Sequence, residues 1–208
     1  MYMVITYNVG SGFRKYAAIW YNAVRWIGER GTDAMTGELP DAYLQFLAHF
    51  HGDRDYFECH ELLEEYWKEH PESPFRHAWV GLIQVAVGMY HYRRGNAAGA
   101  EKSLAGALRR SEPGALRSLG IDAERWIKTL EEALAAVRAG APYRDVDMPF
   151  ADERVEAEGR RRCAELGCAW GAPSRMDEPQ LIHRHTLRDR TDVIEARLRS
   201  LGSRRGDR

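Results

Sequence analysis

The chain has 208 residues, with 30 basic and 31 acidic side chains and a formal net charge of −1. This length suffices for one domain with a hydrophobic core and additional segments. The balanced charge and the lack of a basic low-complexity tract exclude the broad positive field typical of proteins that coat nucleic acid. We therefore expect no nucleic-acid partner.

The compartment is predicted from the cysteines and from the hydrophobic stretches. Cys59, Cys163 and Cys168 are an odd set without the spacing of a secreted disulfide framework, which indicates a reducing cytoplasm. The longest apolar stretch is interrupted by histidines, a glutamine and arginines, and it is too short to cross a membrane. We expect a cytoplasmic protein with no transmembrane segment.

Residues 1–34 are predicted to be an N-terminal extension. Residues 13–27 have the apolar spacing of an amphipathic helix, which suits either a short docking helix or a helix on a membrane surface. A third interpretation is a mis-assigned start: codons for Glu29–Gly31 can spell a purine-rich ribosome-binding signal upstream of Met35. The hypothesis is that Met35 is the true first residue.

Residues 35–150 are predicted to form a compact all-α domain. Apolar periodicity and capping residues delimit successive helices with short links, which predicts an antiparallel or orthogonal helical bundle. The expected helices are 41–51, 55–69, 74–94, 96–110, 113–120 and 123–138. Their expected N-terminal caps include Asn96 and Asp122.

The composition changes after residue 143. Residues 143–150 are expected to be extended and to lie over the bundle, and residues 151–208 are expected to be a charged helical tail. The tail contains two predicted helices, 151–166 and 186–201. Both a loosely docked tail and an interaction arm are consistent with this pattern.

The bundle is organised around the predicted helix 74–94, which is apolar nearly all round and should therefore be buried. Ser73 and Pro74 have the pattern of a capping hydroxyl followed by proline at the first helical position. Gly81 and Gly88 each cost roughly 1 kcal/mol against alanine inside a helix. We expect another backbone to approach closely at these glycines and offset that cost.

A polar line runs along the same helix, in which His77, Gln84 and His91 are each seven residues apart. The preceding helix carries His60 and Glu64 at a spacing of four, so their side chains can touch. A short link predicts an antiparallel pair that places His60 opposite Gln84. The hypothesis is a buried polar cluster within an aromatic shell; its residues are His60, Glu64, Gln84 and His91, with Trp67 and Tyr90 beside them.

These residues also carry a family resemblance. The matching motifs are Tyr56-Phe57-Glu58-x-His60-Glu61-x-x-Glu64-x-x-Trp67, then Gly81-Leu82-Ile83-Gln84, Tyr90-His91 and Gly95-Asn96-x-x-Gly99-Ala100. Over residues 39–137 the chain resembles the bacterial and archaeal domain-of-unknown-function family 309. The resemblance implies an all-helical bundle with His60, Glu64, Gln84 and His91 in its signature, and it implies no activity.

Three roles are open for the polar cluster. It can be a buried hydrogen-bond network that fixes the helix register. It can line a pocket for a small molecule or peptide together with Trp67, Trp79 and Tyr90. It can also hold a divalent metal through His60, Glu64 and His91, since three protein ligands and a water are typical of catalytic zinc.

The favoured function is a non-enzymatic binding or scaffold module with an unknown small-molecule or protein partner. The alternative is a metal-dependent hydrolase that uses His60, Glu64 and His91. A second zinc hypothesis takes two cysteines and two histidines as ligands: Cys163, Cys168, His183 and His185. Their spacing fits no standard zinc finger. The oligomeric state is not predicted.

Overall fold

The computed structural model describes residues 39–187, so the predicted extension and nearly all of the predicted helix 186–201 lie outside the described residues. The helices are α2 (Asp41–His51), α3 (Tyr56–Glu69), α4 (Arg76–Arg93), α5 (Ala97–Leu108), α6 (Pro113–Ser118), α7 (Ala123–Arg138), α8 (Glu153–Glu165), α9 (Pro179–Ile182) and α10 (Arg184–Leu187). The all-α prediction is confirmed. Within residues 39–187, β-pairing is limited to an isolated antiparallel bridge between Ile121 and Phe150. None of the helices described is long and apolar enough to span a membrane.

Three helices begin at polar caps, of which the sequence predicts Asn96 and Asp122. The side chain of Asp55 accepts a hydrogen bond of 3.0 Å from the backbone N–H three residues on. Asn96 and Asp122 do the same at 3.0 and 3.1 Å. Each such bond satisfies a backbone donor that has no partner within the helix, and so fixes where the helix begins.

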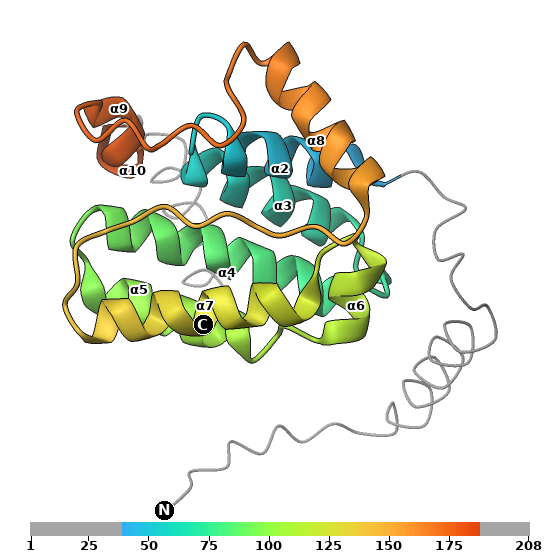
Figure 1. Cartoon of the computed structure of the whole chain (residues 1–208), viewed down its shortest axis with the longest axis horizontal. Coiled ribbons are helices and arrows are strands. Elements are labelled where there is room, and N and C mark those ends of the chain that lie inside the picture. Colours follow the sequence, from blue (N-terminus) through green and yellow to red (C-terminus); the bar gives the residue numbers. More distant parts are fainter. Residues whose placement is uncertain (1–38, 188–208) are drawn as a thin grey trace, which may run out of the picture.

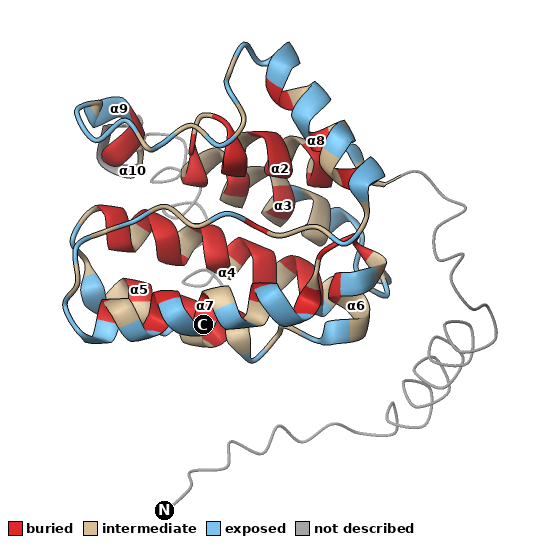
Figure 2. Ribbon diagram, in the orientation of Figure 1, coloured by how far each residue is buried: buried red, intermediate tan, exposed pale blue. Residues whose placement is uncertain are grey.

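The central helix α4 begins at Arg76, two residues later than the predicted Pro74. The hydroxyl of Ser73 accepts hydrogen bonds from the Phe75 backbone N–H at 3.3 Å and from Trp79 Nε1 at 3.1 Å, so it holds the turn before the helix. Twelve of the 18 residues of α4 are buried, which confirms that it is the core helix (Figure 2).

The helices pack mainly against their neighbours in the sequence. Helix α4 lies between α3 and α5, α7 packs on α5, and α2 packs on α3. In Figure 1, α4, α5 and α7 run side by side with α2 and α3 beyond α4. This arrangement is the bundle that short links between amphipathic helices favour.

Another helical segment does approach the glycines of α4, but it is α5 and not the preceding helix α3, which the sequence paired with this face. A Cβ atom on Gly88 would lie 2.8 Å from Leu104 Cγ. A Cβ atom on Gly81 would lie 3.3 Å from Arg110 Cβ, just past the end of α5. The two glycines therefore let side chains of the next helical segment reach the α4 backbone.

The segment after α7 crosses the bundle and leads into α8, which packs on α2 (Figure 1). Residues 143–149 form no regular secondary structure, as predicted for an extended segment. Beyond α8, the Trp170 ring stacks on the buried His51 with 4.2 Å between centroids. The division into a bundle over 35–150 and a tail over 151–208 stays a prediction.

Two buried arginines fasten these late segments to the bundle. Arg54 is 1% exposed and donates to the carbonyl oxygens of Val146 at 3.1 Å and Ala172 at 2.8 Å. Arg93 is 4% exposed and donates to the carbonyl oxygen of Leu181 at 3.0 Å. Residues 146–181 are thus tied to the bundle by contacts that the charged sequence of the tail did not indicate.

A carboxylate beside these arginines joins the same two segments. Asp145 accepts hydrogen bonds from the hydroxyls of Tyr56 at 3.0 Å and Tyr143 at 2.5 Å, and from the Ser174 backbone N–H at 2.8 Å. Partial burial raises the pKa of Asp145, but the hydrogen bonds from the Ser174 hydroxyl and backbone N–H, then that from Tyr143 and the charge of Arg54, outweigh it and lower the pKa. The ionised form of Asp145 is therefore the one that fits the fold.

The α4–α5 approach predicts different costs for two glycine substitutions. Gly88→Ala should lower the free energy of unfolding by about 1–3 kcal/mol, because the added methyl group collides with Leu104. Gly81→Ala should cost less, because its nearest neighbour is 3.3 Å away and alanine favours the helix. Urea denaturation of both variants measures the difference, and equal stabilities would contradict the packing described.

Candidate functional site

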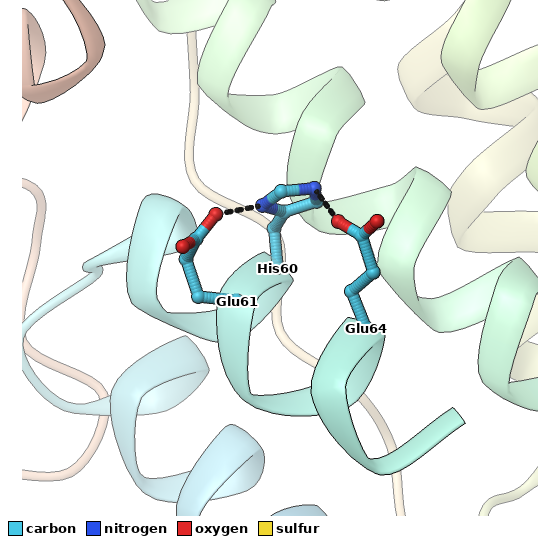
Figure 3. A group of neighbouring side chains, drawn as sticks. All are labelled: His60, Glu61 and Glu64. Atoms are coloured by element: carbon cyan, nitrogen blue, oxygen red, sulfur yellow. Dashed lines mark ion pairs between the residues drawn. The ribbon is translucent and has the colours of Figure 1, made fainter. Parts of the chain in front are cut away.

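The candidate site is a group of three side chains on the outer face of α3. The two ring nitrogens of His60 reach both neighbouring carboxylates: Nδ1 lies 3.1 Å from Glu61 Oε1, and Nε2 lies 2.7 Å from Glu64 Oε2 (Figure 3). The helical spacing produces the His60–Glu64 contact, because positions four apart share one face. The predicted contact between His60 and Glu64 is present, and Glu61 is a member that sequence reasoning assigned to the solvent side.

The group lies at the surface, so the prediction of a buried cluster is wrong for these residues. The side chains of His60, Glu61 and Glu64 are 26%, 37% and 31% exposed. The sequence placed His60 and Glu64 among aromatic residues, but those residues cover only one side of the group.

A lysine completes the charge pattern. Lys68 Nζ lies 2.7 Å from Glu64 Oε1, one helical turn beyond the histidine contact. The Lys68 hydrogen bond and then the His60 charge lower the pKa of Glu64, and the same hydrogen bond raises the pKa of Lys68. Glu64 is therefore held ionised, with one carboxylate oxygen toward His60 and the other toward Lys68.

Half-buried aromatic rings border the group on α3. The Phe57 ring lies 6.1 Å from the His60 ring and 6.1 Å from the ring of Tyr90 on α4. The Trp67 ring packs under the guanidinium of Arg76, whose Cζ is 4.3 Å from the ring centroid. Along α3, an aromatic residue thus precedes the group (Phe57) and another follows it (Trp67).

Gln84 does not join His60, which corrects the predicted cluster. Its Oε1 accepts a hydrogen bond of 3.1 Å from Arg110, which also donates to the carbonyl oxygen of Gly106 at 3.1 Å. A Cβ atom on Gly106 would lie 2.7 Å from the same Gln84 oxygen. The amide therefore lies on the backbone of α5, where glycine leaves room for it.

His91 is also directed to α5, so the predicted metal-ligand set of His60, Glu64 and His91 is not brought together. Its Nδ1 lies 3.0 Å from the side-chain amide of Asn96, and a Cβ atom on Gly99 would lie 2.8 Å from the ring. Partial burial, and then the charge of Arg94, lower the pKa of His91. The imidazole is thus favoured in its neutral form at the α4–α5 turn.

The remaining predicted residues lie apart from the group on α3. Tyr90 is 6% exposed, and its hydroxyl lies 2.8 Å from His185 Nδ1. His77 is exposed at the start of α4. Within the described part of the chain, His60, Glu61 and Glu64 are the residues whose ligand atoms lie close enough together to share a metal ion. The second zinc hypothesis, with Cys163 and Cys168, is therefore not supported.

The predicted aromatic pocket is also corrected. Trp79 is fully buried, and its ring lines a cavity of about 480 Å³ at the α3–α4 turn. The other walls come from this turn and from the ends of α2 and α6, and neither Trp67 nor Tyr90 contributes. The lining residues include Pro40, Tyr66, His70, Pro71 and Phe75. The cavity is therefore separate from the group around His60.

Comparison with known proteins adds a family and a relative. A family model described as "Domain of unknown function (DUF309)" matches residues 43–103, a range that holds the whole group on α3 as well as Gln84 and His91. The chain is similar to the uncharacterized protein YpuF of Bacillus subtilis (strain 168), with 41% identity over 171 residues, 81% of this chain and 98% of YpuF. No solved structure gives a significant match to the chain.

The exposure of the group predicts that it contributes little to stability. Glu64→Gln should lower the free energy of unfolding by less than about 1 kcal/mol, as measured for exposed ion pairs. The matched control is Asp145→Asn, which weakens the four hydrogen bonds to a more enclosed carboxylate and should cost at least about 2 kcal/mol. Urea denaturation compares the two variants, and an equal or larger loss for Glu64→Gln would contradict a surface role.

Proposed function

Because the chain belongs to the family described as domain of unknown function 309, whose description names no activity, we propose its function from its own geometry. It is a cytoplasmic, non-enzymatic binding or scaffold module that docks a protein partner on α3. The docking surface is named the acidic face; its residues are Glu58, His60, Glu61, Glu64 and Glu65. The three free cysteines support the cytoplasmic assignment.

The observation that carries this proposal is the pre-positioned His60 group at the surface. Carboxylates on both sides of the imidazole hold it in one orientation, while the side chains of the group are 26–37% exposed. Exposed ion pairs contribute little to folding. Charges fixed in place beside the aromatic rings of Phe57 and Trp67 instead suit an interface, where aromatic anchors lie next to oriented polar groups.

The charge of the helix indicates the kind of partner. Helix α3 contains five glutamates and one lysine. Glu58 is already paired with a cation from a distant part of the chain, since its carboxylate lies 2.9 Å from Arg184 Nη2. Arg184 shows the type of group that the acidic face accepts, so the partner is expected to present arginine or lysine side chains. Such complementary charge speeds association and selects against acidic surfaces.

Site-specific photocrosslinking in the native cell tests the proposal. A photoreactive amino acid at Glu65, an exposed position on the acidic face, should capture a basic protein. The control places the same amino acid at Glu131, an exposed position on α7. Charge reversal by Glu61→Lys and Glu64→Lys together should lower the crosslinked yield at position 65 at least about tenfold, equivalent to ~1.4 kcal/mol.

The capture must also depend on salt, because exposed charges are screened over about 8 Å at physiological ionic strength. Equal capture at positions 65 and 131 would contradict the proposal. So would a yield that the double charge reversal leaves unchanged, provided that the variant retains the wild-type unfolding transition.

A second candidate function, a metal-dependent hydrolase, is favoured by one observation. The ligand atoms of His60, Glu61 and Glu64 all lie within 4.8 Å of one another, close enough to share one ion. One imidazole and two carboxylates would supply three protein ligands, as in catalytic zinc sites. On this proposal Glu61 takes the place that the sequence gave to His91, and the ion replaces the direct contacts between the imidazole and the two carboxylates.

Calorimetric titration of the chelator-treated protein with Zn²⁺ or Mn²⁺ tests the second candidate. Binding at one site per chain should be lost in His60→Ala and weakened at least about tenfold in Glu61→Gln, while His91→Ala should bind as the wild type does. Binding that persists in His60→Ala, or that His91→Ala abolishes, would overturn this ligand set.

A further inference from the structure

Two cysteines meet at the end of α8, far along the chain from the acidic face. Helix α8 closes with Gly167 in the left-handed conformation, at a φ of +72°. The Gly167 N–H donates to the carbonyl of Ala164 at 3.0 Å, and the Cys168 N–H donates to the carbonyl of Cys163 at 3.1 Å. This pair of hydrogen bonds is the Schellman motif.

The motif accounts for the meeting of the cysteines. In a Schellman motif the residue after the left-handed glycine commonly contacts the residue five positions before it, and this contact is usually hydrophobic. Here both positions are cysteine. The two Sγ atoms lie 3.0 Å apart, and each thiol donates to the backbone carbonyl of the other residue, at 3.3 Å and 3.1 Å.

The rest of the fold holds the two sulfurs in this place. They lie on Gly52 at the end of α2, where an added Cβ atom would be 2.5 Å from Cys168 Sγ and 2.6 Å from Cys163 Sγ. The next residues are also fixed, since the Gly171 N–H donates to the carbonyl of His51 at 2.7 Å. The sulfurs are about 1 Å beyond the ~2.05 Å length of a disulfide bond, and Gly52 packs against both of them.

We propose that Cys163 and Cys168 form a dithiol site that low-molecular-weight disulfides oxidise to an intramolecular disulfide. This site is independent of the function proposed for the acidic face. The reaction crosslinks the end of α8 to the first residue of the loop that carries Trp170. Because that loop docks on α2 through Trp170 and His51, oxidation restricts the loop at its origin.

The exposure of the two thiols sets the order of the reaction. Cys168 is half-buried, whereas Cys163 is 0% exposed, so Cys168 meets the small disulfide first. Burial, and then the hydrogen bond with Cys168, raise the pKa of the Cys163 thiol to about 12, which makes it a poor first nucleophile.

The exchange balances in two steps. Cys168 loses its proton, and its sulfur attacks one sulfur of the small disulfide; the S–S bond breaks, and one small thiolate leaves and takes up the proton. Cys163 then loses its proton, and its sulfur attacks Cys168 Sγ and expels the second small thiol. Two protein thiols are oxidised by two electrons to one disulfide, and the small disulfide is reduced to two thiols.

The test uses the full-length protein equilibrated in mixtures of reduced and oxidised glutathione, quenched with acid and alkylated before peptide mass spectrometry. We expect a crosslinked peptide that joins Cys163 to Cys168. Cys59 should remain reduced, because it is 0% exposed and its pKa is raised by burial. Cys163→Ser should stop at a glutathione adduct on Cys168, which identifies Cys168 as the attacking residue.

The unfolded chain is the control for geometry, since a disulfide there must also overcome the entropy of closing the loop. In urea the pair should need at least about a tenfold higher oxidant ratio for half-oxidation, a difference of ~30 mV for this two-electron couple. Equal ratios for the folded and unfolded chains would overturn the proposal. So would a glutathione adduct on Cys168 that persists in the wild-type protein while Cys163 stays reduced.

Discussion

The close packing of α4 on α5 is the constraint from which the rest of the arrangement follows. Side chains of each helix pack against glycines of the other. Leu104 of α5 packs against Gly88 of α4, and His91 and Gln84 of α4 pack against Gly99 and Gly106 of α5. Dispersion contacts at such short range depend on the missing Cβ atoms, so an ordinary residue at these positions would force the helices apart. Two members of the polar line of α4, Gln84 and His91, are thereby used within the α4–α5 contact and are not available to α3.

This exchange explains why the His60 group is at the surface. The periodicity of α4 shows that Gln84 and His91 share a line with a spacing of seven, but periodicity alone does not say which neighbour that line faces. The deciding signal was present in α5, where Gly99 and Gly106 have the same spacing of seven. Matching the two spacings would have paired the polar line with α5 and left His60 without a buried partner on α4.

Most of the helices could be predicted from the sequence because residues next to each boundary, such as N-terminal caps, determine where the helix begins. Asn96 and Asp122 act as caps in the structure as the sequence predicts, and Asp55, predicted as the first residue of its helix, caps it. The docking of residues 146–181 could not be predicted in this way, because it depends on contacts between distant segments. Arg54 donates a hydrogen bond to the carbonyl oxygen of Ala172, which is 118 positions away. Because most arginines are exposed, the sequence alone would predict that this buried arginine lies at the surface.

Glu64 connects the two candidate functions of the acidic face and makes them compete. One of its carboxylate oxygens faces His60 and the other faces Lys68. An arginine or lysine from a protein partner would compete with Lys68 for one carboxylate oxygen, whereas a bound divalent ion would enter between Glu64 and His60 and replace their contact. Lys68 is 61% exposed, so breaking its ion pair with Glu64 should cost little free energy, since exposed ion pairs contribute about 0–1 kcal/mol to stability. The acidic face is therefore a site already occupied by a weak internal cation, and any partner that it binds must offer a charge that interacts with Glu64 more favourably than Lys68 does.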